Sequence, residues 1–154
     1  MLRQNLVADR VSRIELATPV SVAPTASVRE AITRMRAGHC GYVLLCDGHG
    51  LKGIFTERDL LIRVLGGKAD FGAPIAEVAT PDPISIHEDD TVRVVIQRML
   101  AGGYRHLPVV DASGAPVGVV SVRGLIHYLV EHFPGAVYNL PPTPDQAQED
   151  REGA

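Results

Sequence analysis

The sequence contains no tryptophan, and aromatic residues make up only 5% of its 154 residues. Any core built from this chain must therefore be mainly aliphatic. No apolar run approaches the roughly 20 residues needed to span a bilayer. The first ten residues, MLRQNLVADR, also lack the apolar stretch of a secretory signal. We therefore expect a cytoplasmic protein without a membrane segment.

The chain has 15 lysines and arginines against 18 aspartates and glutamates, which gives a net charge of −3. A surface that binds nucleic acid needs a basic excess, so we expect no such partner. The only cysteines are Cys40 and Cys46, too few for a disulfide framework. Together with His39 and His49 they match no standard zinc spacing. The sequence therefore predicts no metal held by protein ligands.

One segment of the chain occurs twice. A shift of 64 residues aligns identical residues along the first part of both copies, and a shift of 65 aligns the second part. The clearest matches are Pro19 with Pro83, Val28-Arg29 with Val92-Arg93, Arg34-Met35 with Arg98-Met99, Gly53 with Gly118, and Arg58 with Arg123. A register kept over this length indicates a structural repeat.

Each copy predicts the order β-α-β-β-α, an α/β fold. A short strand after a proline is followed by a helix whose apolar residues recur every three or four positions. Ser27 and Glu30 predict a capping box at the first of these helices, and glycines at 38 and 102–103 end the two helices. The remaining strands are short and apolar, which favours burial on both faces. We therefore expect the two sheets to pack together about a pseudo-two-fold axis.

The repeats suggest four regions along the chain. Residues 1–13 are an N-terminal extension with a weak helical pattern, and residues 14–68 are the first repeat. Residues 69–133 comprise a linker and the second repeat. Residues 134–154 form a Pro-rich acidic tail that we expect to be disordered.

The junction between the third strand and the second helix carries the most chemistry. In the first copy it contains Thr56 and, three residues later, Asp59. A helix start offers free N–H groups that favour anions, and a carboxylate there can accept hydrogen bonds from ribose hydroxyls. The same two residues also fit a capping box that needs no ligand. Spacing alone leaves both interpretations open.

With the duplication, these junctions make the sequence resemble the tandem CBS-domain (Bateman) module over residues 14–133. The resemblance rests on the proline-led first strands, the segment HLPVVD at 106–111, and the Gly-x-x-(Thr/Ser)-x-x-Asp junction. It implies two CBS repeats with two clefts between them, and in the family these clefts bind adenosine-containing ligands. It also implies a sensor that acts as a dimer on another protein.

The resemblance assigns three groups of residues to the first cleft. The ribose-binding positions are Thr56 and Asp59. The positions that pack against the base or sugar are Ile54, Pro83, Ile84 and Tyr104. The positions that reach phosphate are Arg58, Arg105 and His106.

The second cleft departs from the family pattern. Gly124 stands where the carboxylate belongs, and Gly41 and Tyr42 stand in place of the arginine and histidine. We expect this cleft to be weak, empty or used differently. Its matching residues are Pro19, Val20, Tyr42, Val119, Ser121 and Arg123.

Three hypotheses for function follow. The first is a non-catalytic sensor that binds AMP, ADP, ATP or NAD in one cleft, with Mg²⁺ arriving only with the nucleotide, as a homodimer that acts on an unidentified protein. The acidic run at 87–90 precedes a helix and fits its dipole, although it could lie near such an ion. The second is a dimerisation or interaction module without a ligand. The third is an enzyme, which no carboxylate pair, catalytic triad or metal-ligand spacing supports.

Overall fold

The computed structural model describes residues 2–67 and 69–135, so most of the predicted tail lies outside the described residues. The first copy contains β1 (Ser21–Val22), α2 (Val28–Ala37), β2 (Tyr42–Asp47), β3 (Gly50–Thr56) and α3 (Glu57–Asp59), which continues as a π-helix over Leu60–Leu65. The second contains β5 (Ile86–His87), α4 (Val92–Gly102), β6 (His106–Val110), β7 (Pro116–Ser121) and α5 (Val122–His132). The predicted order β-α-β-β-α, written twice, is confirmed. No helix in the described ranges is long and apolar enough to cross a membrane.

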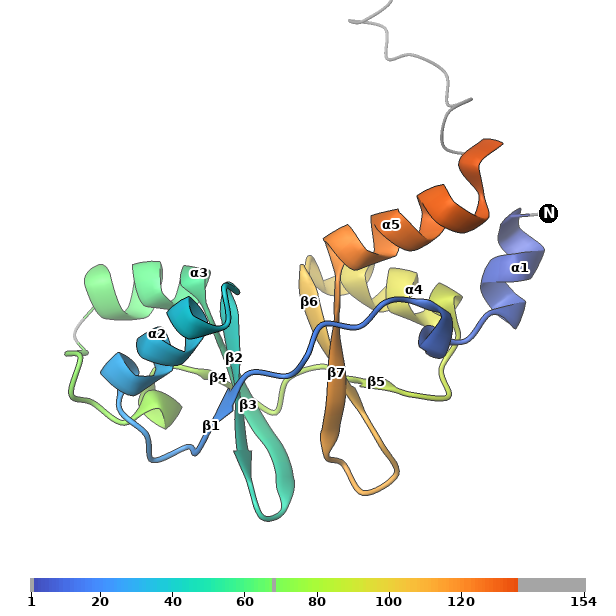
Figure 1. The fold of residues 1–154 in the computed structure, drawn as a ribbon. Helices are drawn as coiled ribbons and strands as arrows, with labels where there is room; N and C mark the ends of the chain where they lie inside the picture. Colours follow the sequence, from blue (N-terminus) through green and yellow to red (C-terminus); the bar gives the residue numbers. More distant parts are fainter. Residues whose placement is uncertain (1, 68, 136–154) are drawn as a thin grey trace, which may run out of the picture.

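Each copy forms its own sheet, and the two sheets lie side by side at the centre of the molecule (Figure 1). In both copies the first strand is parallel to the second, and the second and third form an antiparallel hairpin. Tyr42 and Leu44 of β2 pack against Val119 of β7, and these three side chains are at most 3% exposed. This apolar layer joins the copies, so the expected sheet-to-sheet packing is confirmed.

The helices begin and end where their residues predict. The Ser27 hydroxyl accepts a hydrogen bond from the N–H of Glu30, which caps α2, so among the described contacts only the Ser27 half of the predicted capping box forms. Val28, Ala31 and Met35 form the buried face of α2. Helix α4 ends at Gly103, whose φ of 66° is left-handed and costs a glycine little. The closing helix of the first copy differs from expectation. After one α-helical turn it widens, so that the N–H of Gly66 bonds to the carbonyl of Leu61.

The segment before each copy completes the sheet of the other copy. Residues leading into β1 reach across to the second sheet, where Ala17 and Val119 exchange two backbone hydrogen bonds of 2.9 and 3.0 Å. Residues leading into β5 form β4 (Thr80–Pro81), which pairs with β3 in the first sheet. Figure 1 shows the N-terminal segment crossing from beside α4 and α5 to β1. The two copies are therefore interlocked.

The exchange follows the repeat to the residue. Val11 donates to the carbonyl of Asp90 at 2.9 Å, and 64 residues later Ile75 donates to the carbonyl of Ala26 at 2.7 Å. Both side chains are fully buried. Val11 lies in the core of the second copy, and Ile75 lies in the core of the first. Short helix α1 (Leu2–Ala8) also lies against α4. The expected regions 14–68 and 69–133 divide the sequence in order. In the folded protein, however, each leading segment packs on the other copy.

Candidate functional site

The β3–α3 junction is a complete capping box. The N–H of Asp59 donates to the Thr56 hydroxyl oxygen at 3.3 Å, and Oδ2 of Asp59 accepts from the N–H and hydroxyl of Thr56 at 3.0 and 3.1 Å. The capping interpretation is therefore confirmed. It does not exclude a ligand, because these bonds to the carboxylate all use Oδ2, and Oδ1 takes no part in them.

Sequence reasoning missed a third member of this junction, Arg63. Its Nε lies 3.6 Å from Oδ1 of Asp59, and its Nη1 donates to the carbonyls of Val78 and Ala79. The position four residues after Asp59 was a usable signal, since oppositely charged residues at this spacing meet on a helix. The carbonyl contacts could not be foreseen, because they depend on the exchanged segment.

His106 meets the first copy directly. Its ring lies 4.9 Å from the ring of Tyr42, centroid to centroid, with the planes tilted by 44°. Partial burial lowers the pKa of His106, the Glu57 carboxylate opposes this shift, and the Arg105 guanidinium adds to it. A lowered pKa favours the neutral imidazole near neutral pH. Tyr42 is 3% exposed, so most of it belongs to the core.

A hollow of about 490 Å³ opens at the start of α5. Its lining residues are Arg105, His106, Ser121, Val122, Arg123 and Ile126. Of these residues, Arg105 and His106 were expected in the first cleft, and Ser121 and Arg123 in the second. The structure brings them together because His106 and Ser121 are directly paired in the antiparallel β6–β7 register. Two arginines and a histidine therefore face one hollow.

The residues expected to pack against a base or sugar remain accessible to different degrees. Ile84 is 47% exposed and Tyr104 is 40% exposed, whereas Pro83 and Ile54 are half-buried. Arg58, expected near phosphate, is exposed. Apolar side chains with this much exposed surface are available for contact with a flat ring.

The comparison with known families decides what this architecture is. The family model described as CBS domain matches residues 11–66 and again residues 75–131. The chain belongs to the CBS-domain family. The two matches start 64 residues apart, at Val11 and Ile75, so each family unit includes the leading segment that packs on the other copy.

Other CBS-domain proteins resemble the chain over most of its length. An uncharacterized 17.7 kDa protein of Acidianus ambivalens is 30% identical over 126 residues, covering 81% of this chain and 76% of that protein. The CBS domain protein of Pyrobaculum aerophilum solved in complex with AMP is 30% identical, with a TM-score of 0.71, and the match covers 79% of this chain and 96% of that one. The cytosolic domain of the Mg²⁺ channel MgtE solved with ATP is 25% identical, with a TM-score of 0.67, covering 80% and 51%. Several CBS domain-containing proteins of Arabidopsis thaliana are much longer, and the chain spans 22% of their length.

In the second CBS repeat, the position that matches Asp59 is tightly packed. A Cβ atom placed on Gly124 would lie 3.1 Å from the carbonyl oxygen of Glu15, which belongs to the exchanged N-terminal segment. The Ser121 hydroxyl accepts from the N–H of Gly124 at 2.9 Å, so the cap is kept. Of the other residues expected there, Val119 is fully buried, and Pro19 and Val20 are half-buried.

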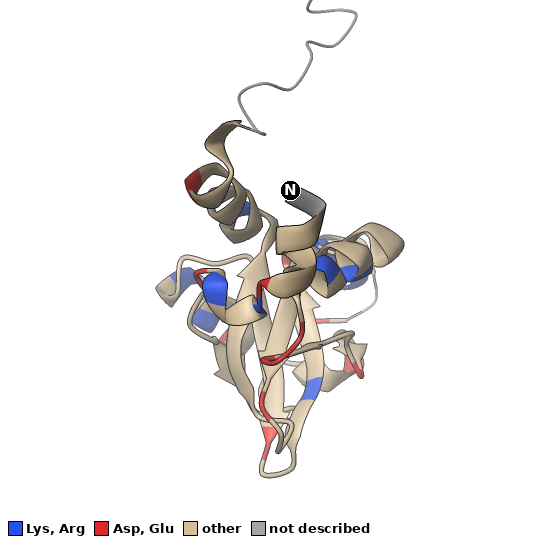
Figure 2. Ribbon diagram, turned by 90° about the vertical axis from the view of Figure 1, so that its right-hand side faces the viewer, with Lys and Arg blue, Asp and Glu red and all other residues tan. Residues whose placement is uncertain are grey.

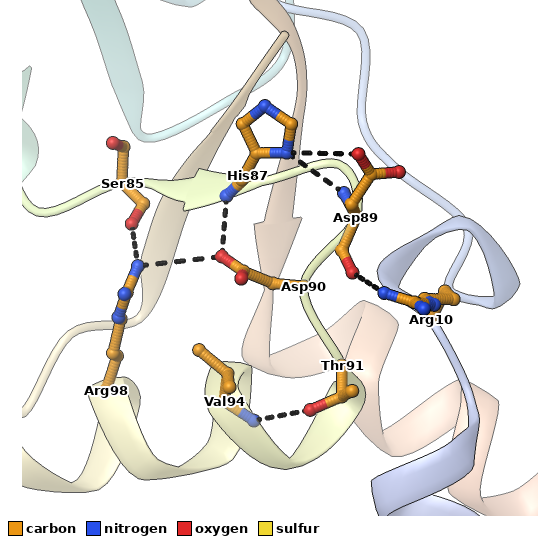
Figure 3. Close-up of polar contacts among 8 residues, drawn as sticks. All are labelled: Arg10, Ser85, His87, Asp89, Asp90, Thr91, Val94 and Arg98. Atoms are coloured by element: carbon orange, nitrogen blue, oxygen red, sulfur yellow. Dashed lines mark hydrogen bonds and ion pairs between the residues drawn. The ribbon is translucent and has the colours of Figure 1, made fainter. Parts of the chain in front are cut away.

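The polar run at 87–90 organises the start of α4 in the second CBS repeat (Figure 3). The N–H of His87 donates to Oδ2 of Asp90 at 2.8 Å, and Nη1 of Arg98 lies 3.8 Å from the same oxygen. Arg10 of the exchanged segment donates to the carbonyl of Asp89. Each of these contacts lies within the chain, and together they hold the start of α4 in place.

The cysteines and nearby histidines of the first CBS repeat do not gather into a site. His39 and His49 are exposed, while Cys40 and Cys46 are half-buried beside the layer between the sheets. Burial, aided by Asp47, raises the pKa of the Cys46 thiol, which disfavours the reactive thiolate. Within residues 2–67 and 69–135, no group of three His, Cys, Asp or Glu residues could hold a metal ion.

Figure 2 shows basic residues mainly on helices and acidic residues mainly in the connecting loops.

Proposed function

We propose that this protein is a regulatory module that binds an adenine nucleotide in one cleft between its CBS repeats. The observation that carries the proposal is the junction at Thr56 and Asp59, which keeps the family's ribose-binding residues with Oδ1 outside the capping bonds. The AMP complex of the 30% identical Pyrobaculum aerophilum protein supports the ligand class. Mg²⁺ would enter only with the nucleotide. CBS domains are generally regulatory rather than catalytic modules, which favours a sensor over an enzyme.

In this proposal the ribose lies at Asp59, the base packs against Ile84 and Tyr104, and the phosphate lies near Arg105 and His106. An arginine suits a phosphate because its planar group donates two parallel hydrogen bonds. The exposed apolar residues Leu61, Leu65 and Ile126 on the closing helices support the further proposal of a homodimer.

Calorimetric titration with adenosine, AMP, ADP, ATP and NAD tests the proposal. We expect at least one phosphate-bearing member to bind the wild type. Arg105→Ala should weaken its binding by at least about tenfold, because the charged hydrogen bonds to the phosphate are lost, and should leave adenosine binding nearly unchanged. The control is Arg36→Ala, an exposed arginine on α2, which should bind as the wild type does. Failure of the whole panel to bind would contradict the proposal and favour an interaction module without a ligand.

Restoring the missing carboxylate should not create a second site. In Gly124→Asp the new side chain meets the Glu15 carbonyl, so we expect one nucleotide per chain, as in the wild type. We also expect the free energy of unfolding to fall by about 1–3 kcal/mol from overpacking. Calorimetric stoichiometry and urea denaturation measure the two effects. Two nucleotides bound per chain would show that the second cleft lacks only a carboxylate.

A further inference from the structure

Arg63 contacts two segments that lie apart in the sequence, the β3–α3 junction and the segment that leads into β4. Its Nε lies 3.6 Å from Oδ1 of Asp59, and its Nη1 donates to the carbonyls of Val78 and Ala79 at 3.3 and 3.0 Å. A guanidinium group presents its donors in a fixed planar fork, so one side chain can hold both partners at once. Arg63 therefore links the carboxylate to the segment that enters the second repeat.

The two oxygens of Asp59 are used differently. Oδ2 accepts two hydrogen bonds from Thr56, which occupy both of its acceptor positions. Arg63 approaches Oδ1 at a distance longer than a normal hydrogen bond. The Asp59 side chain is only 13% exposed, and a nearby cation stabilises a carboxylate that is partly removed from water. Oδ1 is therefore the oxygen with acceptor capacity left for a ligand hydroxyl, and Arg63 is the cation that holds it in place.

The carbonyls that Arg63 binds lie just before the residues proposed to contact the base. Val78 and Ala79 are 4% and 5% exposed and belong to the core of the first repeat. Strand β4 follows them and ends at Pro81, and Pro83 and Ile84 lie two and three residues farther along the chain. A substitution of Arg63 therefore removes contacts both with the Asp59 carboxylate and with the carbonyls of Val78 and Ala79 in the exchanged segment.

The second repeat provides an internal comparison, because it lacks this arrangement. Tyr128 occupies the position that matches Arg63, and its hydroxyl donates to Asp9 instead. Gly124 matches Asp59, and the Glu15 carbonyl, which matches that of Ala79, lies against it. The carboxylate and the arginine are thus present together in one repeat and absent together from the other.

We infer that Arg63 is a positioning residue for the proposed nucleotide site, which orients Asp59 toward the ribose and couples ribose contact to the segment leading to Pro83 and Ile84. The inference rests on the proposed function. Arg63 touches no ligand atom in this scheme. Its effect is on ribose recognition, through Asp59, and on the order of residues 78–84.

The test compares AMP with 2′-deoxy-AMP and 3′-deoxy-AMP by calorimetry, in the wild type and in Arg63→Gln. In the wild type at least one deoxy ligand should bind about tenfold more weakly than AMP, because a hydrogen bond to a carboxylate is lost. In Arg63→Gln the ratio of the Kd for this deoxy ligand to the Kd for AMP should fall at least threefold. Hydrogen exchange of the amides in residues 78–84 should also become faster, and AMP should protect them less than in the wild type.

Two further variants separate positioning from a loss of stability. Arg36→Gln, at an exposed position on α2, should keep the wild-type ratio. In the Asp59→Asn background, Arg63→Gln should not change the ratio further. If Arg63→Gln does not fold, Arg63→Lys replaces it. An ammonium group lacks the planar fork that reaches the carboxylate and both carbonyls from separate nitrogens, so the same fall in the affinity ratio is expected.

The outcomes distinguish the two proposals. If AMP and the rest of the nucleotide panel fail to bind the wild type, the proposed function fails. If AMP binds the wild type with the expected ribose discrimination, and the Arg63 variant keeps that ratio within twofold, the inference about Arg63 is overturned while the proposed function stands.

Discussion

Val11→Asp should unfold the second repeat, although residue 11 precedes the first repeat in the sequence. Val11 is fully buried in the core formed with Ile86, Val92 and Leu107. A carboxylate there has no described partner and must be buried or expel the exchanged segment. We expect the free energy of unfolding to fall by more than about 4 kcal/mol, a large part of what a domain of this size has. Urea denaturation followed by circular dichroism measures the change.

Milder and matched substitutions serve as controls for this prediction. Val11→Ala should cost roughly 2–3 kcal/mol, from lost apolar burial and a residual cavity. Ile75→Ala, at the matching position of the other exchanged segment, should cost at least as much. Val7→Ala, on the exposed side of α1, should change little. A Val11→Asp variant as stable as Val7→Ala would mean that the N-terminal segment does not complete the second repeat in solution.

Asp59→Ala should abolish most nucleotide affinity. In the proposed complex the carboxylate accepts hydrogen bonds from the ribose hydroxyls, and losing two bonds to a charged group costs about 2–4 kcal/mol, roughly a 30- to 1,000-fold loss in affinity. Calorimetric titration with the tightest member of the panel measures it. The nucleotide affinity of Asp59→Asn should lie between those of the alanine variant and the wild type, because its amide oxygen still accepts hydrogen bonds but carries no charge.

The alanine variant also loses half of a capping box, and this loss needs its own control. Ser27→Ala removes the cap of α2, far along the chain from the junction, and should cost a similar stability of about 0.5–2 kcal/mol. Its nucleotide affinity should match the wild type. If Asp59→Ala binds nucleotide as tightly as Ser27→Ala does, the capping box is the whole role of Asp59.

The sequence predicted the fold well because each local signal agreed with the repeat. The caps at Ser27 and Thr56 and the glycines after the helices lie where their chemistry requires. The exchange of the leading segments was not predicted, because the two segments match in apolar character, as in Val11 with Ile75, rather than in identical residues. Without that exchange, the space beside Gly124 could not be judged.

The candidate site was predicted in its parts but not in its grouping. The register of a hairpin places Arg105 and His106 beside Ser121, and this pairing was implicit in the predicted strands. The π-helix after Asp59 has no comparable signal, since its wider turn depends on tertiary packing. The contacts of Arg63 with two distant carbonyls likewise arise only once the chain has folded.

The interlocking of the two copies has a consequence for how such a chain divides. Each sheet is extended by a segment from the opposite half of the chain, by β4 beside β3 in the first sheet and by Ala17 beside Val119 in the second. A polypeptide holding one copy alone would leave that edge open, and a second molecule would have to fill it by giving its own leading strand. The tandem pair is in this sense a strand-exchanged dimer joined into one polypeptide. Two halves separated at Gly66–Gly67 would each carry the piece that the other needs, and so would reassemble as complementing fragments.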